Sequence, residues 1–269
     1  MSISEAPVAQ SVRGASFEGR NFLVVGGASG IGAAVAAGLK GQGAAVDVFD
    51  RVSPDQPVPG VEYATVDVRD AQSVEAAVET VLHRRGTVDG LVYAAGVLDG
   101  YATLEEIGEE LMGTVLDVNV VGAVRVLQAV APHMKRAGYG RIVLFDSIAG
   151  TVGGAAGIAY TMSKHAVGGL TKHLALELGP FGITTNSVAP GSIAGTKIRT
   201  NIEEILGTGK VATNRGLGTM SPEEAAKHYP VGRLGSIDSV VPSVLHLLAE
   251  SSWFINGSTV TIDGGFTAK

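Results

Sequence analysis

Short apolar runs alternate with longer helical segments along most of the chain, and this alternation is the feature that most restricts its fold. The apolar runs and the helical patterns between them fall at 22–25, 31–42, 45–49, 61–68, 71–85, 90–94, 104–134, 141–145, 157–178, 184–188, 239–249 and 259–262. Strands that alternate with helices form βαβ units, which require a parallel sheet with helices on both faces. The nearly continuous apolar runs suit strands that are buried on both faces. We therefore expect an α/β fold with one doubly wound parallel sheet of about seven strands.

No proline-rich linker divides the chain after residue 60, which predicts a single domain. We place this domain at 20–269, with an N-terminal extension at 1–19. The segment at about 192–222 is rich in Gly, Thr and Asn and has weak periodicity. Long irregular insertions in compact domains usually act as lids or mobile loops. We expect this one to close over a bound substrate and to exclude water.

The composition excludes several classes of protein. The 269 residues include no cysteine, which removes disulfide frameworks, thiolate nucleophiles and Cys-based metal sites, and the six histidines show no metal-ligand spacing. A net charge of -6 without a local Lys/Arg cluster argues against a nucleic-acid partner. Residues 1–20 lack a secretory-signal pattern, and Asp117, Asn119 and Arg125 interrupt the apolar stretch around 111–131. We expect a soluble cytoplasmic protein with no membrane partner and no metal.

A glycine-rich run, GGASGIG at 26–32, joins the first strand to the first helix. Glycines there let the chain turn tightly and let backbone N–H groups approach a pyrophosphate, which the positive end of the helix also attracts. Doubly wound sheets bind dinucleotides at this first βα turn, so we expect a Rossmann-like cofactor site. The residues predicted to form the turn are Gly26, Ala28, Ser29, Gly30, Ile31 and Gly32.

Asp50 ends the second strand, and Arg51 follows it. A carboxylate at this position can accept hydrogen bonds from both ribose hydroxyls of an adenosine, and it repels a 2′-phosphate. The Arg51 guanidinium beside the ribose could instead tolerate that phosphate. We expect NAD as the cofactor and keep NADP as the alternative.

Tyr160 and Lys164 lie four residues apart in a helical segment and share one face of it. Ser147 follows the fifth strand, where the cofactor crevice of a parallel sheet opens. A free phenol has a pKa near ~10, and a lysine ammonium one turn away, together with a positively charged nicotinamide, favours its phenolate. Tyr160 could then remove a hydroxyl proton while hydride leaves the carbon, and Ser147 would hold the substrate oxygen. Such Tyr–Lys pairs also arise by chance, but the glycine turn, Asp50 and Ser147 fall in compatible places.

With these residues in place, the chain resembles the short-chain dehydrogenase/reductase family from about residue 20 to 266. The motifs that carry the resemblance are Gly26-Gly27-Ala28-Ser29-Gly30-Ile31-Gly32, Asp67-Val68, Ala95-Gly96, Asn119, Ser147, Tyr160 with Lys164, Asn186-Ser187-Val188-Ala189-Pro190-Gly191 and Asp263-Gly264-Gly265. The chain departs from the family's pattern at Gly26, where threonine is usual, and at Asp146, where serine is frequent. Residues 93–96 read Tyr-Ala-Ala-Gly where Asn-Asn-Ala-Gly is usual.

The resemblance implies a role for each matching residue. Tyr160 would be the acid/base, Lys164 would bind the nicotinamide ribose and lower the pKa of Tyr160, and Ser147 would position the substrate. Asn119 would hold a water in a proton relay to Lys164. The further cofactor-binding residues that the resemblance implies are Asp67 and Val68 at the adenine, Ala94, Ala95, Gly96, Pro190 and Gly191, and Ile193 at the carboxamide. The family is commonly tetrameric and would pack here through helices at about 103–131 and 158–178.

Together these features predict an NAD-dependent oxidoreductase that transfers a hydride between the nicotinamide and a secondary alcohol or ketone. The modest apolar content of the 192–222 segment suggests a small or medium hydrophobic alcohol. The alternatives are an NADP-dependent carbonyl reductase with the same catalytic residues and a catalytically silent nucleotide-binding regulator. Asp99 and Tyr101 lie just past the fourth strand, above the same crevice. Either could contact substrate, but polar residues are ordinary in such loops, and we do not count them as catalytic.

Overall fold

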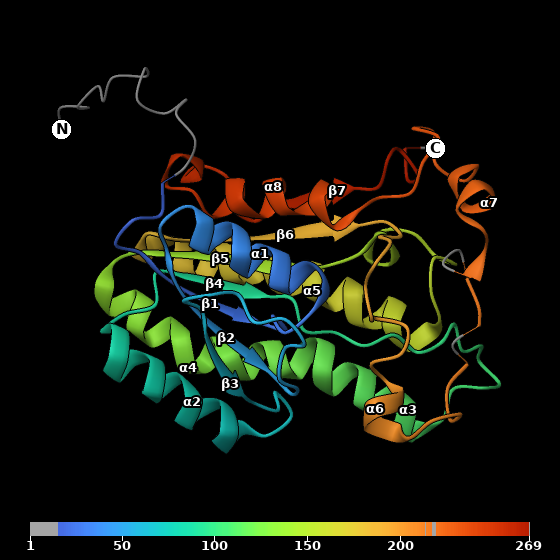
Figure 1. Cartoon of the computed structure of the whole chain (residues 1–269), viewed down its shortest axis with the longest axis horizontal. Helices are drawn as coiled ribbons and strands as arrows, with labels where there is room; N and C mark the ends of the chain where they lie inside the picture. The colour runs from blue at the N-terminus through green and yellow to red at the C-terminus, as the bar shows by residue number, and fades with distance from the viewer. Residues whose placement is uncertain (1–15, 213, 217–218, 269) are drawn as a thin grey trace.

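Seven parallel strands form a single sheet in the order β3-β2-β1-β4-β5-β6-β7 (Figure 1). The computed structural model describes residues 16–212, 214–216 and 219–268. The strands are β1 (Asn21–Val25), β2 (Ala45–Asp50), β3 (Glu62–Thr65), β4 (Gly90–Tyr93), β5 (Gly140–Phe145), β6 (Ile183–Pro190) and β7 (Thr259–Ile262). The order runs outward from β1 in both directions, which confirms the predicted doubly wound parallel sheet.

Helices cover both faces of this sheet (Figure 1). The helices are α1 (Gly30–Gly41), α2 (Ala71–Arg85), α3 (Glu109–Leu116), the π-helix η2 (Asp117–Val121), α4 (Gly122–Ala137), the 3-10 helix η3 (Ile148–Gly150), α5 (Ile158–Leu178), η4 (Gly179–Phe181), α6 (Glu203–Leu206), α7 (Pro222–Ala226), α8 (Ile237–Leu248) and η6 (Glu250–Ser252). Helices α1 and α8 pack together on one face, and α2, α4 and α5 lie on the other.

Strand β1 shows why an unbroken apolar run is needed at the centre of the sheet. Phe22 and Val24 point into the hydrophobic cluster under α1 and α8, whereas Leu23 and Val25 point into the cluster under α2, α4 and α5. Successive side chains of a strand face opposite sides, so a strand between two helical layers must be apolar at every position.

The long apolar stretch predicted over 104–134 is helical from Glu109 to Ala137, through α3, η2 and α4. Its length of 29 residues and mean hydropathy of 1.5 would suffice for a membrane span, and 44% of the most apolar window is buried inside the fold. Helix α4 packs against α2 and β5. The π-turn in the middle of the run holds Asn119 with its side chain buried.

Two boundaries differ from the sequence prediction. The third strand ends at Thr65 rather than at 68, so Asp67 and Val68 lie beyond the sheet, at its carboxyl edge. Residues 1–15 of the expected N-terminal extension lie outside the described residues. Phe17, inside that extension, is only 3% exposed and packs edge-on against Phe22, at 5.0 Å between ring centroids. The packed part of the chain therefore includes residue 17.

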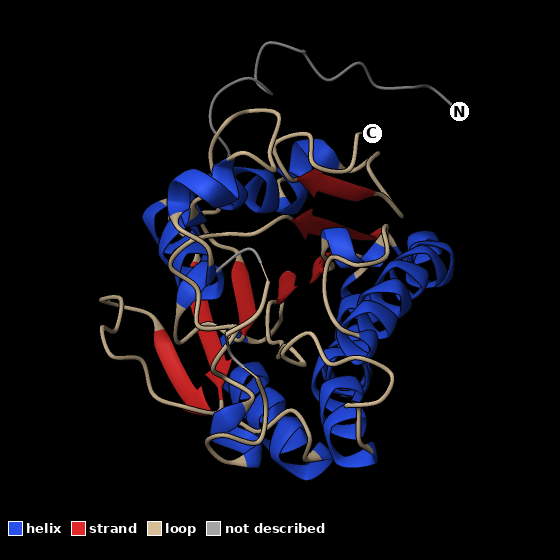
Figure 2. Ribbon diagram, turned by 90° about the vertical axis from the view of Figure 1, so that its right-hand side faces the viewer, coloured by secondary structure: helices blue, strands red, loops and turns tan. Residues whose placement is uncertain are grey.

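The predicted insertion at 192–222 runs past the carboxyl ends of the strands and contains α6 (Figures 1 and 2). Ion pairs tie it to distant parts of the chain. Lys197 Nζ lies 2.9 Å from Asp55 Oδ2, and Arg215 Nη2 donates to Glu106 Oε1 at 2.7 Å. The segment thus lies over the edge of the sheet where parallel strands open onto a ligand crevice.

Candidate active site

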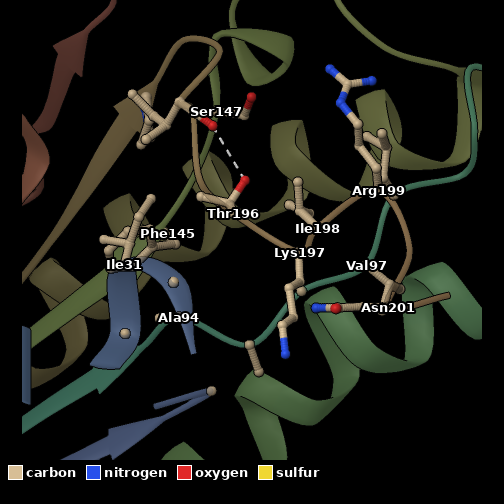
Figure 3. Close-up of a pocket in the computed structure, with 18 of the residues that line it drawn as sticks. Ile31, Ala94, Val97, Phe145, Ser147, Thr196, Lys197, Ile198, Arg199 and Asn201 are labelled. Carbon is tan, nitrogen blue, oxygen red and sulfur yellow. Dashed lines mark hydrogen bonds between the residues drawn. The ribbon is translucent and has the colours of Figure 1, made fainter. Parts of the chain in front are cut away.

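A cavity of about 970 Å³ opens at the carboxyl edge of the sheet (Figure 3). Its walls come from the glycine turn after β1, the residues after β2 to β6, and the insertion. Every catalytic and cofactor-binding residue predicted from the sequence lines this cavity except Asn119. The sheet therefore gathers residues from across the chain into one site.

Two positions of the glycine turn pack so closely against backbone that only glycine fits. Gly26 has a φ of +82°, and a Cβ there would lie 2.4 Å from the backbone nitrogen of Ala95. A Cβ on Gly32 would lie 2.1 Å from the carbonyl oxygen of Gly26. Ser29, the N-cap of α1, makes no side-chain hydrogen bond to the first turn of the helix. The positive end of α1 thus faces the cavity without a side chain of its own over it, which suits a pyrophosphate.

Asp50 lies at the end of β2 beside this turn. Its Oδ2 accepts a hydrogen bond from the backbone nitrogen of Ala28 at 2.9 Å, and its Oδ1 accepts one from Val52 at 3.2 Å. The Arg51 side chain forms an ion pair with Glu204 of α6. The Asp50 carboxylate therefore lies at the expected ribose position. The neighbouring Arg51 guanidinium is already paired with the Glu204 carboxylate.

Asp67 and Val68 lie next to Arg51 on the cavity wall. Both carboxylate oxygens of Asp67 accept hydrogen bonds from the Arg69 guanidinium, at 2.6 to 3.1 Å. These bonds lower the pKa of Asp67 below its ordinary value and outweigh the effect of its burial. Asp67 is therefore ionised and is fixed at the edge of the expected adenine pocket.

Tyr160, Lys164 and Ser147 meet where α5 passes the end of β5. Tyr160 and Lys164 occupy successive turns of α5, and both side chains are buried. Lys164 Nζ lies 5.3 Å from the centroid of the Tyr160 ring and donates to the carbonyl oxygen of Phe145 at 2.7 Å. Ser147 lies close enough to Tyr160 for its side chain to lower the pKa of the phenol. The predicted catalytic group is thus assembled in one wall of the cavity.

Burial decides the charge state of this group. It raises the pKa of Tyr160 above the ordinary value of a phenol, and the Ser147 side chain acts in the opposite direction. This is opposite to the lowering predicted from Lys164. Burial also lowers the pKa of Lys164 to about 8, against the attraction of Asp146. At neutral pH the protein alone therefore presents a neutral phenol beside an ammonium group.

Asp146 stands directly before Ser147 and is also buried. Its Oδ1 accepts a hydrogen bond from the backbone nitrogen of Ser147 at 2.8 Å, and burial raises its pKa to about 6. A Cβ on Gly150 would lie 2.1 Å from the same oxygen, so the turn of η3 closes tightly around the carboxylate. Asp146 therefore braces the backbone that carries Ser147 and supplies negative charge near Lys164.

Asn119 lies behind the cavity wall rather than in it. Its Oδ1 accepts from the backbone nitrogen of Val97 at 2.8 Å, and its Nδ2 donates to the Val97 carbonyl and to Ser163 Oγ, both at 3.0 Å. A Cβ on Gly96 would lie 3.4 Å from Asn119 Oδ1 and 3.8 Å from Lys164 Nζ. Asn119 thus joins η2 to the loop after β4 and to α5, and it shares one neighbour with Lys164.

Asp99 has a structural role that the sequence interpretation did not assign. Its Oδ2 accepts from the backbone nitrogen of Tyr160 at 3.0 Å, and its Oδ1 accepts from that of Tyr101 at 3.2 Å. Gly157, the N-cap of α5, provides no capping side chain, and a Cβ there would lie 2.5 Å from Asp99 Oδ1. A carboxylate 61 positions away in the sequence therefore caps the helix that carries Tyr160. Its position just past β4 was the only sequence signal.

The residues after β6 form the remaining wall. Gly191 donates its backbone N–H to Ile262 at 3.0 Å, and the N–H of Ser192 donates to the Tyr229 hydroxyl at 2.9 Å. Ile193 pairs with Gly235 in an isolated bridge. Tyr229, which was not predicted, thus holds the strand end where the carboxamide contact was expected.

Known proteins resemble this chain over nearly its full length. Residues 26–267 match the family described as Enoyl-(Acyl carrier protein) reductase. The chain is 38% identical over 252 residues to the short-chain reductase protein NovJ of Streptomyces niveus, covering 90% of this chain and 92% of NovJ. It is 32% identical over 261 residues to D-threitol dehydrogenase of Mycolicibacterium smegmatis, covering 94% of each. The solved structure of ElxO with NADP bound matches with a TM-score of 0.80 and 27% identity, covering 93% of this chain and 99% of that one.

Proposed function

The chain belongs to the short-chain dehydrogenase/reductase family of oxidoreductases, and from this premise we propose that it transfers a hydride between NAD and a secondary alcohol or ketone. The observation that carries the proposal is the juxtaposition of Ser147, Tyr160 and Lys164 with the glycine turn in one cavity. The glycine turn would hold the pyrophosphate, Asp50 the adenosine ribose and Lys164 the nicotinamide ribose. A bound nicotinamide would supply the hydride acceptor or donor.

The chain's own residues would position the substrate and move its proton. Ser147 would hold the substrate oxygen beside the Tyr160 hydroxyl, because both residues line the same cavity and Ser147 is close enough to influence the pKa of the phenol. In ketone reduction, the neutral phenol of Tyr160 would donate its proton to that oxygen. In alcohol oxidation, the phenolate of Tyr160 would take the hydroxyl proton and become the neutral phenol. The Lys164 ammonium and Ser147 would stabilise the negative charge of this phenolate, which is also the charge that develops on Tyr160 in ketone reduction.

Two features support NAD over NADP as the cofactor. The Asp50 carboxylate would repel a 2′-phosphate. Arg51, the residue best placed to neutralise that phosphate, is already paired with Glu204. Titration of the protein with each cofactor tests this preference. We expect tighter binding of NAD and expect Asp50→Ala to reduce the difference. If Asp50→Ala keeps the full preference for NAD, Asp50 does not discriminate between the cofactors.

The NADP-dependent carbonyl reductase remains the second candidate, because the related ElxO structure has NADP bound. The same titration separates the two candidates, since tighter binding of NADP would favour the NADP-dependent reductase.

The substrate side of the cavity has an apolar wall beside Tyr160, formed by Leu98, Ala155, Ala156 and Ile198. This wall supports a secondary alcohol or ketone with a small or medium hydrocarbon part.

We also propose a homotetramer, formed through α4 and α5, in the cytoplasm. Met162 and Leu176 of α5 are 47% and 82% exposed, and Val121 before α4 is 41% exposed. Exposed apolar side chains on these helices would be covered in such an assembly. Light scattering coupled to gel filtration measures the subunit number, and cell fractionation tests the compartment.

A screen of secondary alcohols, followed by the absorbance of NADH, tests the proposed activity. We expect turnover of at least one alcohol class and its loss in Tyr160→Phe, which keeps the ring but removes the hydroxyl. Binding of NAD without turnover of any alcohol or ketone would favour the catalytically silent regulator instead.

A further inference from the structure

The basic side chains around the cavity differ in their partners. The arginines and lysines that line it are Arg51, Arg69, Lys164, Lys197 and Arg199. Three of them form ion pairs: Arg51 with Glu204, Arg69 with Asp67, and Lys197 with Asp55. Lys164 belongs to the catalytic group. Within the described part of the chain, Arg199 is the one among the five that has neither a carboxylate partner nor a catalytic role.

Arg199 is nevertheless held in a defined place. Its guanidinium carbon lies 5.7 Å from the centroid of the Tyr101 ring, and its Nη1 donates to the carbonyl oxygen of Arg215 at 2.7 Å. Arg215 is anchored in turn by Glu106. Tyr101 has a φ of +60°, the only positive φ among the described non-glycine residues. Strained backbone of this kind is concentrated at ligand sites. Nη1 of the guanidinium is therefore occupied, and the other nitrogens have no hydrogen-bond partner among the described residues.

The side chain points toward the substrate half of the cavity. Figure 3 shows Lys197 and Arg199 leaving the same segment in opposite directions, with the Arg199 guanidinium on the side where Ser147 lies. Lys197 instead reaches Asp55, next to the cofactor end. The Tyr101 ring under Arg199 packs against the cluster that contains Tyr160. Arg199 therefore lies on the substrate side of the cavity, with the Tyr101 ring between it and the cluster around Tyr160.

Few carboxylates line this half of the cavity, although the chain as a whole carries a net charge of -6. The carboxylates that line the cavity are Asp50, Asp55, Asp67, Asp146 and Glu204. Asp67, Asp55 and Glu204 are ion-paired with Arg69, Lys197 and Arg51, and Asp50 lies at the expected adenosine ribose. Asp146 is buried against the backbone of Ser147. The described lining residues within 97–101 and 216–234 include His228 but no acid. An anion entering here meets no carboxylate on these walls.

The geometry points to an oxyanion on the substrate, bound by Arg199, so that the enzyme selects hydroxy acids or keto acids over neutral alcohols of the same skeleton. This inference rests on the proposed function and adds the substrate class. A planar guanidinium with free donors matches the two oxygens of a carboxylate, and the half-buried site strengthens that pairing. A phosphate monoester presents the same oxyanion chemistry.

The test compares alcohols that differ only in one terminal group. The probes are 3-hydroxybutyrate and 4-hydroxypentanoate, their methyl esters, and 3-hydroxybutyl phosphate. For each probe, kcat and KM are measured in the wild type, Arg199→Gln, Arg199→Lys and the control Lys197→Gln. We expect kcat/KM of the wild type to be about 10-fold to 100-fold higher for an acid than for its ester, mainly through KM. A higher kcat/KM for 3-hydroxybutyl phosphate than for the two carboxylates would identify a phosphate as the oxyanion.

Arg199→Gln should abolish the ratio of acid to ester, Arg199→Lys should restore part of it, and Lys197→Gln should leave the ratio unchanged. Equal kcat/KM for acid and ester in the wild type would overturn the inference. So would an unchanged ratio in Arg199→Gln. In both cases turnover of the esters would leave the proposed function intact. If no probe turns over, calorimetric titration of 3-hydroxybutyrate into the NAD-saturated protein decides: binding that is lost in Arg199→Gln supports the site, and no binding to the wild type overturns it.

Discussion

At the scale of single residues, Asp146 and Lys164 set the charge around the Tyr160 hydroxyl. Burial raises the pKa of Asp146 to about 6 and lowers that of Lys164 to about 8, and each group's charge favours the charge of the other. Between these two values both groups are ionised. The protein therefore holds a buried carboxylate and a buried ammonium beside the proposed acid/base at neutral pH, and burial of each charge has a cost in folding free energy.

Asp146→Asn should change the pH dependence of stability. Because the folded-state pKa of Asp146 lies above its ordinary value of 3.8, the folded protein binds the proton more tightly than the unfolded chain. Stability from this group is fully present below about 3.8 and is lost as the pH rises through about 6. We expect Asp146→Asn, which can keep the bond from the Ser147 nitrogen, to be more stable than wild type at pH 8 by on the order of 2 kcal/mol.

Urea unfolding at pH 4 and pH 8 measures this difference. The advantage of Asp146→Asn should nearly vanish at pH 4, where the wild-type carboxyl is mostly protonated. A difference that is the same at both values, or a less stable variant at pH 8, contradicts the assignment of a buried charge.

At the scale of elements, the position of α5 decides whether Tyr160 and Lys164 face the cavity. Its N-terminus is capped by Asp99 from the loop after β4, because Gly157 has no side chain to do so. Asp99 therefore acts on Tyr160 through the backbone and is a positioning residue.

Asp99→Ala should leave the first-turn N–H groups of α5 without their acceptor. We expect a loss of stability of about 1–2 kcal/mol and a fall in kcat that exceeds the change in KM. Asp99→Asn, which keeps one oxygen acceptor, should recover part of both. Thermal unfolding and steady-state kinetics measure these effects. Wild-type kcat in Asp99→Ala would show that the cap does not hold Tyr160 in place.

The ion pair between Arg51 and Glu204 fastens α6 to the end of β2. Glu204→Gln would free the Arg51 guanidinium, which could then neutralise a 2′-phosphate. We expect the variant to bind NADP about 10-fold more tightly than wild type, with little change for NAD. Fluorescence titration with both cofactors measures this. The matched control is Asp55→Asn, which breaks the neighbouring Lys197 pair and should leave NADP affinity unchanged. Unaltered NADP affinity in Glu204→Gln would remove Arg51 from cofactor selection.

The sequence predicts best what lies at junctions between neighbouring elements. The glycine turn, Asp50 and the Tyr160–Lys164 pair each follow from a local pattern. Their place in one cavity follows from the parallel sheet. Asp99 could not be assigned, because its partner is 61 positions away and depends on how a loop meets a helix. The pair of Arg51 with Glu204 spans 153 positions for the same reason. The direction of the pKa shift of Tyr160 was wrong for the protein alone, since burial is a property of the finished packing.

At the scale of the whole molecule, the site lies where the order of strands reverses. Strand β1 pairs with both β2 and β4, so the turn after β1 meets the turn after β4. Gly26 and Ala95 are in contact there, and a threonine at position 26 would overlap that backbone. Two of the departures from the family's usual pattern, at Gly26 and at 93–96, therefore fall on one contact. The fold brings the glycine turn and the α5 residues Tyr160 and Lys164 to the same crevice.

The central claim is that the Tyr160 hydroxyl transfers the substrate proton during hydride transfer. The most direct measurement is the single-turnover rate of NADH formation in Tyr160→Phe, at saturating NAD and a secondary alcohol that the wild type oxidises. The account predicts that the variant binds NAD as wild type does and forms NADH at least about 100-fold more slowly. A single-turnover rate within about twofold of wild type would contradict it.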